Sequence, residues 1–243
     1  MKEIYLALIV LLANIVEAIS GFGSVIIAVT LGANLYDIDK LISILLPISL
    51  CLSTYIVTKH HKFIRFNFIM KEILPFMTSG LIVGLIILNY FPVSSLKNIY
   101  GVLVLILSIK ELYFMLVHKN KERKELPSLI SAISIFLAGI VHGLYASGGP
   151  LLVYGLSSKK LDKDVFRVTL STIWLIFNLT LFIVYLFTNR VSIENLKISA
   201  FLIPTLILGI YVGEKVHHKI NERVFRISVF SILLIAGLRL SLV

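Results

Sequence analysis

The pattern of apolar and polar positions divides the chain into eight apolar segments, separated by short basic or turn-forming loops. Six segments are about as long as one membrane-spanning helix, whereas the first and the fifth are longer and are interrupted by glycine. The pattern therefore predicts an all-α polytopic membrane protein. The predicted segments are 4–31, 41–58, 73–90, 98–117, 128–156, 167–187, 198–214 and 224–242.

Each long segment contains a cluster of residues that a continuous helix tolerates poorly. Glycines raise the free-energy cost of the helix, and Pro150 lacks a backbone donor but suits the first turn of a new helix. We predict two hairpins of half-helices of about 13 residues, each with a glycine-rich tip. Broken backbone at membrane depth lines protein or a water-filled cavity, so each tip is a candidate substrate site. The predicted substrate-binding residues at the tips are Gly21, Phe22, Gly23, Ser24, Tyr145, Ser147, Gly148, Gly149 and Pro150.

An internal repeat relates the two halves of the chain. Proline and glycine positions recur at fixed offsets, and such matches are less expected by chance than matches at leucine. We predict a first transmembrane repeat over 1–118, a charged cytoplasmic linker over 119–126 and a second repeat over 127–243. The recurring positions are Pro75, Gly80 and Gly84 with Pro204, Gly209 and Gly213, and Glu17 and Gly23 with His142 and Gly148.

The positions of Lys and Arg indicate how the two repeats are oriented. Loops 59–71, 119–124, 159–167 and 215–226 carry four basic residues each, which is sixteen of the chain's 23. If both long segments are re-entrant hairpins, all four loops fall on one side of the membrane, as cytoplasmic loops should. Each repeat then contains one hairpin and three spans, and the repeats are inverted, as in many secondary transporters. This arrangement places both termini outside the cell.

Composition excludes several classes of protein. With 58% apolar and 15% charged residues, the chain has no room for a soluble domain beyond its loops. The net charge of +10 is explained by cytoplasmic loops, so we expect no nucleic-acid partner. We find no HExxH or GxSxG motif and expect neither an enzyme nor a cofactor. The adjacent histidines His60-His61 and His217-His218 lack a Cys or carboxylate cluster, so we interpret them as solvated loop residues rather than metal ligands.

The glycine-rich elements GFGSVIIAV and GLYASGGPLLVYGL resemble those of the TauE/SafE (sulfite exporter) family of membrane permeases. The runs KFIRFNFIMKEILPFMTSGLIVG and RVTLSTIWLIFNLTLF are similar to that family too, so the resemblance covers nearly the whole chain. It implies transport of small sulfur-containing anions such as sulfite or organosulfonates across the cell membrane, with no enzymatic step. The first tip reads Gly-Phe-Gly-Ser and lacks the Gly-Gly-Pro of the second.

The chemistry of a helix start supports an anionic substrate independently. A half-helix that begins at a buried tip presents unpaired N–H groups and a partial positive charge, which suit sulfite or sulfonate oxygens. Tight packing of helices through small residues is the alternative explanation for the glycines. A cation or proton channel that uses Glu17 and the glycine-rich loops is the alternative function. The oligomeric state is left open.

Two titratable residues occupy the same position of the repeat, just before each tip. Glu17 and His142 are the predicted proton-coupling residues, because a titratable group inside a membrane is costly and usually faces a cavity or a partner. The alternative is a structural hydrogen-bonded pair. Polar residues of the second and sixth segments, Ser53, Trp174 and Asn178, are predicted to line the substrate site.

Overall fold

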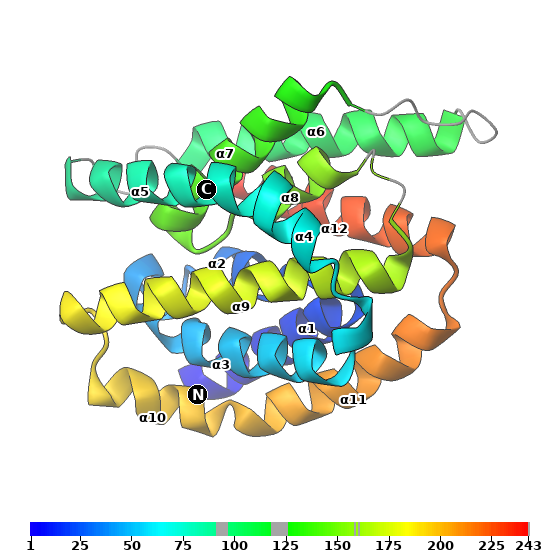
Figure 1. Ribbon diagram of the computed structural model, residues 1–243. Coiled ribbons are helices and arrows are strands. Elements are labelled where there is room, and N and C mark those ends of the chain that lie inside the picture. The colour runs from blue at the N-terminus through cyan, green and yellow to red at the C-terminus, as the bar shows by residue number, and fades with distance from the viewer. Residues whose placement is uncertain (91–96, 118–125, 158, 160, 243) are drawn as a thin grey trace. The chain divides into compact units, whose positions relative to one another are not determined.

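The computed structural model describes residues 1–90, 97–117, 126–157, 159 and 161–242, and every regular element in these ranges is a helix (Figure 1). The predicted linker 119–126 lies almost wholly outside the described residues. The helices are α1 (Lys2–Ser20), α2 (Ser24–Gly32), α3 (Ile38–Lys59), η1 (His61–Phe63), α4 (Phe66–Phe68), η2 (Ile69–Ile73), α5 (Leu74–Tyr90), α6 (Lys97–Val117), α7 (Ser128–Tyr145), α8 (Gly149–Leu156), α9 (Lys163–Phe187), α10 (Ile193–Phe201), α11 (Ile203–Lys219) and α12 (Glu222–Leu242).

The prediction of an all-α polytopic membrane protein is confirmed. Five helices of the described chain are long and apolar enough to cross a membrane, and six if the bent pair α10–α11 counts as one span. Large apolar side chains such as Phe76, Ile82 and Ile86 on α5 are exposed, which suits a surface that faces lipid tails rather than water.

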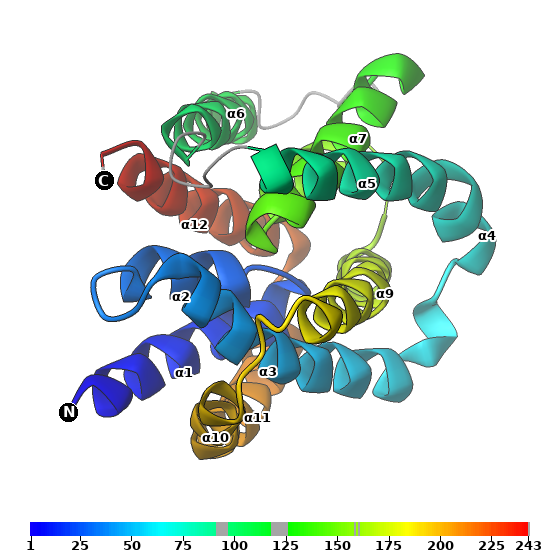
Figure 2. The ribbon, with the colours of Figure 1, turned by 90° about the vertical axis from the view of Figure 1, so that its left-hand side faces the viewer.

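The helices form two compact units, and each unit contains segments from both predicted repeats. The first unit comprises Met1–Phe66 and Asp162–Ile220, with α1, α2, α3, α9, α10 and α11. Within it, α1 packs on α11 and α3 packs on α9, as Figures 1 and 2 show. The second unit comprises Asn67–Leu161 and Asn221–Val243; there α5 packs on α7, and α6 packs on α12.

The first long segment is a hairpin, because α2 runs back along α1. The start of α2 lies at Glu17, and Gly32 at its end lies beside Leu6 near the start of α1. Gly21 ends α1 in the left-handed region (φ 82°) and donates its N–H to the Glu17 carbonyl at 2.7 Å. Gly23 precedes α2 with φ 109°, so both breaks use backbone conformations that favour glycine.

The fifth segment forms a similar hairpin in the second unit. Helix α7 ends at Ala146 in the left-handed region (φ 51°), and Pro150 lies in the first turn of α8. The end of α8 returns to the start of α7, where the Ser131 hydroxyl donates to the Gly155 carbonyl at 2.8 Å. The expected half-helices of about 13 residues are wrong in both hairpins. Helices α1 and α7 have 19 and 18 residues and α2 and α8 have 9 and 8, because the glycines lie well past the middle of each segment.

Glycines of α5 bring its backbone against α7 in the second unit. A Cβ atom on Gly80 would overlap the carbonyl oxygen of Phe136, and one on Gly84 would overlap that of Ile140. The two helices therefore approach more closely than any larger residue allows, as small residues permit in membranes.

The repeat-equivalent glycines of α11 have the same role in the first unit. A Cβ atom on Gly209 would lie 2.6 Å from the Cβ of Asn14, and one on Gly213 would overlap Ala18, both on α1. Asn14 and Ala18 precede Gly139 and Gly143 of α7 by the repeat offset of 125. The glycine contacts of each hairpin are thus made at equivalent positions of the predicted repeats.

Proline interrupts the equivalent spans of the two repeats. The predicted seventh segment begins five residues early, at Ile193, and bends by 42° between α10 and α11, just before Pro204. In the first repeat, a π-helical turn (η2) precedes Pro75. Both distortions are explained by the backbone donor that proline lacks and by the clash of its ring with the preceding turn.

Candidate functional site

A buried carboxylate lies at the break of the first hairpin. Glu17, in the last turn of α1, is 3% exposed. Its Oε2 accepts a hydrogen bond from the backbone N–H of Ser24 at 3.0 Å and another from the Ser24 hydroxyl. Because Ser24 is the first residue of α2, the carboxylate caps the positive end of that half-helix.

Polar residues of α3 and α9 extend this site. The Ser49 hydroxyl donates to Glu17 Oε1 at 3.3 Å, and the Asn178 side-chain amide donates to Ser49 at 3.0 Å. Ser53, one turn along α3, is fully buried beside the same carboxylate, and Trp174, one turn before Asn178 on α9, is 5% exposed. The structure therefore brings the first tip together with the predicted lining residues Ser53 and Asn178.

The tip itself is held by its backbone. A Cβ atom on Gly21 would overlap the carbonyl oxygen of Arg167 in α9, so only glycine fits between α1 and α9 there. Phe22 is 1% exposed, and the Ser20 hydroxyl lies 2.7 Å from its carbonyl oxygen. Gly21 is explained by packing and conformation, and the N–H that meets the carboxylate belongs to Ser24.

The second tip belongs to the other unit. His142, Tyr145, Ser147, Gly149 and Pro150 are all buried there. A Cβ atom on Gly148 would overlap the carbonyl oxygen of Ala138, so close packing of the tip on α7 explains that glycine. Since His142 and Glu17 lie in different units, their coupling stays a prediction.

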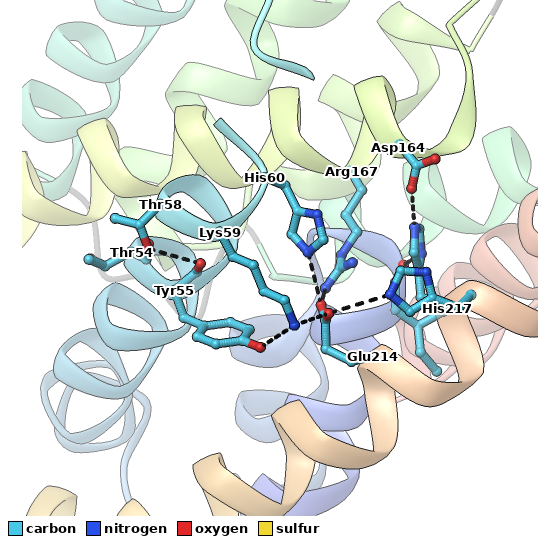
Figure 3. Close-up of polar contacts among 11 residues, drawn as sticks. Thr54, Tyr55, Thr58, Lys59, His60, Asp164, Arg167, Glu214 and His217 are labelled. Atoms are coloured by element: carbon cyan, nitrogen blue, oxygen red, sulfur yellow. Dashed lines mark hydrogen bonds and ion pairs between the residues drawn. The ribbon is translucent and has the colours of Figure 1, made fainter. Parts of the chain in front are cut away.

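A cluster of basic residues around Glu214 was not predicted from the sequence (Figure 3). The Glu214 carboxylate, on α11, contacts the guanidinium of Arg167, the Lys59 amino group at 2.7 Å, His60 at 3.3 Å and His218 at 3.7 Å. Arg167 is 1% exposed. We call these five residues the Glu214 cluster. Burial and the nearby Arg167 guanidinium hold the pKa of His60 below its usual value, against the opposing effect of Glu214.

His217 ties α11 to two other helices beside the Glu214 cluster. Its Nε2 lies 2.8 Å from the Asp164 carboxylate at the start of α9, and its Nδ1 lies 2.7 Å from the Ile19 carbonyl in the last turn of α1. Both partners are acceptors, so a ring nitrogen that carries a proton can donate to either of them. Lys163 adds hydrogen bonds to the carbonyl oxygens of His217 and Ile220.

The interpretation of the adjacent histidines as solvated loop residues was therefore wrong for His60 and His217. His217 is fully buried, and the His60 side chain is 13% exposed. One sequence signal could have found the cluster, since Glu214 is the one acidic residue between Glu194 and Glu222 and needs a partner if buried. Among the described residues, no group of three or more His, Cys, Asp or Glu side chains could hold a metal ion.

Several membrane-spanning helices and two interrupted hairpins, one with a carboxylate at a buried helix start, are typical of membrane transport proteins. The family model described as "Sulfite exporter TauE/SafE" matches residues 6–240. The chain therefore belongs to this family, and it is a multi-pass membrane transport protein. Comparisons with curated proteins and with solved structures found no match.

Proposed function

We propose that this protein is a secondary transporter of small sulfur-containing anions such as sulfite or organosulfonates in the cell membrane. We further propose that it works by alternating access, with proton coupling through Glu17 and His142. The observation that carries the proposal is the buried start of α2, whose backbone N–H already binds a carboxylate. Family membership supports the class of substrate.

The donors around Glu17 suit an oxyanion. The Ser24 N–H, the Ser24 hydroxyl and the Ser49 hydroxyl converge on one negative group, and among the described residues no Lys, Arg or His forms an ion pair with it. Neutral donors at a helix start bind anions without the strong, slowly reversed attraction of a buried cation. A sulfonate has three oxygens that could accept the same hydrogen bonds.

These contacts also weigh against the cation channel. A filter for cations needs oxygen atoms that face the ion, whereas the first tip directs N–H and O–H donors at its one carboxylate. The second tip is a weaker candidate for binding, because packing on α7 explains Gly148.

Transport by purified protein in liposomes tests the proposal. Vesicles loaded with sulfite or sulfoacetate should exchange the anion in a saturable way, and protein-free vesicles should not. Conductance of cations alone would favour the channel and contradict the proposal.

A pair of neighbouring hydroxyls on α3 localises the site. Ser53→Ala removes a buried hydroxyl beside Glu17, whereas Thr54→Val removes an exposed hydroxyl of the next residue. A hydrogen bond to a charged group contributes about 1.5–3 kcal/mol, so Ser53→Ala should raise the half-saturating anion concentration roughly ten-fold or more. Thr54→Val should leave it unchanged, and equal effects of the two variants would place the site elsewhere.

A further inference from the structure

We infer that the Glu17 carboxylate and the transported anion take turns at the start of α2, so that the anion binds only when Glu17 is protonated. This inference rests on the proposed function and specifies how it is coupled. It makes the protein a symporter, in which a proton and the anion move in the same direction.

The Glu17 carboxylate occupies the donors that a bound anion would need. Glu17 accepts the Ser24 N–H and the Ser24 hydroxyl, which are the donors that an oxyanion at this half-helix would use. A second anion in hydrogen-bond contact with Ser24 would lie within a few ångströms of the carboxylate in a buried place. Two like charges so close cannot both stay ionised, as in carboxylate pairs that share one proton. The anion therefore binds only when the Glu17 carboxyl group is protonated and neutral.

Buried polar groups of α3 and α9 lie beside the carboxylate. The Ser53 hydroxyl is completely buried next to Glu17, where it is a further donor beside the hydroxyls of Ser24 and Ser49. The side-chain oxygen of Asn178 is buried without a partner among the described residues, although its amide group donates to Ser49. Buried polar atoms are nearly always paired, so this acceptor oxygen indicates that a donor, such as a protonated carboxyl group, completes the site in another state.

On the described helices that pack around the start of α2, Glu17 is the titratable side chain that contacts this helix start. Helix α2 carries no titratable side chain, and α3 presents only Ser49 and Ser53 to the carboxylate. From α11, His217 reaches α1 but contacts the Ile19 carbonyl, and Glu214 lies in its own cluster. From α9, Arg167 directs its guanidinium to Glu214.

The charge balance follows from this exchange. A proton from the outer solution neutralises Glu17, and the Ser24 donors then bind the anion. On the other side the anion leaves, the proton dissociates, and the carboxylate returns to Ser24. One proton thus accompanies one anion, so a monoanion moves with no net charge and a dianion moves with one net negative charge.

The test uses sulfoacetate in liposomes that contain a trapped pH dye. Above about pH 6 its sulfonate and its carboxylate both stay ionised, so its charge is constant, whereas sulfite itself takes up a proton near neutral pH. In the wild-type protein we expect anion-dependent acidification inside the vesicles. Above the pKa of Glu17, the half-saturating concentration should rise toward ten-fold per pH unit, as expected for uptake of one proton. Glu3→Gln is the matched control, because Glu3 is an exposed carboxylate at the start of the same helix, and it should behave as wild type.

Glu17→Gln keeps the shape of the side chain but cannot ionise. The folded variant should bind sulfoacetate, with an affinity that does not change with pH, and should exchange the anion without moving protons. Binding is measured separately, by the rise of the thermal unfolding temperature with added sulfoacetate, so a variant that cannot transport still gives an answer. Wild-type pH dependence in Glu17→Gln, or folded variant protein without sulfoacetate binding, would overturn the inference. Wild-type vesicles that carry no anion would instead overturn the proposed function.

Discussion

Removal of Glu214 should destabilise the protein more than removal of its buried partner Arg167. Glu214→Met leaves the guanidinium of Arg167, which is 1% exposed, with no acidic partner among the described residues, and an uncompensated buried charge costs about 3–5 kcal/mol. Arg167→Met leaves Glu214 paired with Lys59 at 2.7 Å, so only charge-assisted hydrogen bonds are lost, at about 1.5–3 kcal/mol. The double variant removes both charges and should be destabilised by less than the sum of the two single variants.

The free energy of unfolding in mixed detergent micelles measures this cycle. The coupling between the two positions should be about 2 kcal/mol or more, within the range for residues in one ion-pair network. The control is the pair Lys40 and Glu194, which lie 2.9 Å apart with side chains 32% and 73% exposed, so its coupling should not exceed about 1 kcal/mol. Strict additivity of Arg167→Met and Glu214→Met would show that the two groups are not paired.

Two further predictions concern the first hairpin and the topology. Gly21→Ala and Gly23→Ala both place alanine at a positive φ, which costs roughly 1–2 kcal/mol. Only Gly21→Ala also meets the backbone of Arg167, so it should lower the thermal unfolding temperature further; equal shifts would contradict the close contact. On a Cys51→Ser background, a cysteine at Lys62 should react with an impermeant thiol reagent only after the membrane is opened. External labelling at that position would contradict the predicted orientation.

The sequence was sufficient to predict the helical segments and both hairpin tips. The breaks depend on local properties, namely the backbone freedom of Gly21 and Gly23 and the missing donor of Pro150, which are visible in the residues themselves. The prediction of Glu17 as a proton-coupling residue also relied on membrane burial, which raises the cost of any titratable group.

The Glu214 cluster could not be predicted in the same way. Arg167 and His217 have the sequence surroundings of solvated loop residues, and they are buried only because α9 and α11 pack within one unit. The capping of α2 by Glu17 was likewise missed, since the carboxylate reaches a donor seven residues ahead, across the turn. Such contacts depend on tertiary packing rather than on the spacing of residues.

Arg167 contacts both the first tip and the Glu214 carboxylate. Its main chain abuts Gly21 with no space for a side chain, and its guanidinium binds Glu214. His217 adds a second connection, from the Ile19 carbonyl to Asp164. The tip and the charged ends of α9 and α11 must therefore be displaced together, so that any movement which uncovers Ser24 also disturbs the ion pairs. A spectroscopic label beside Lys59 would therefore report movements of the buried tip.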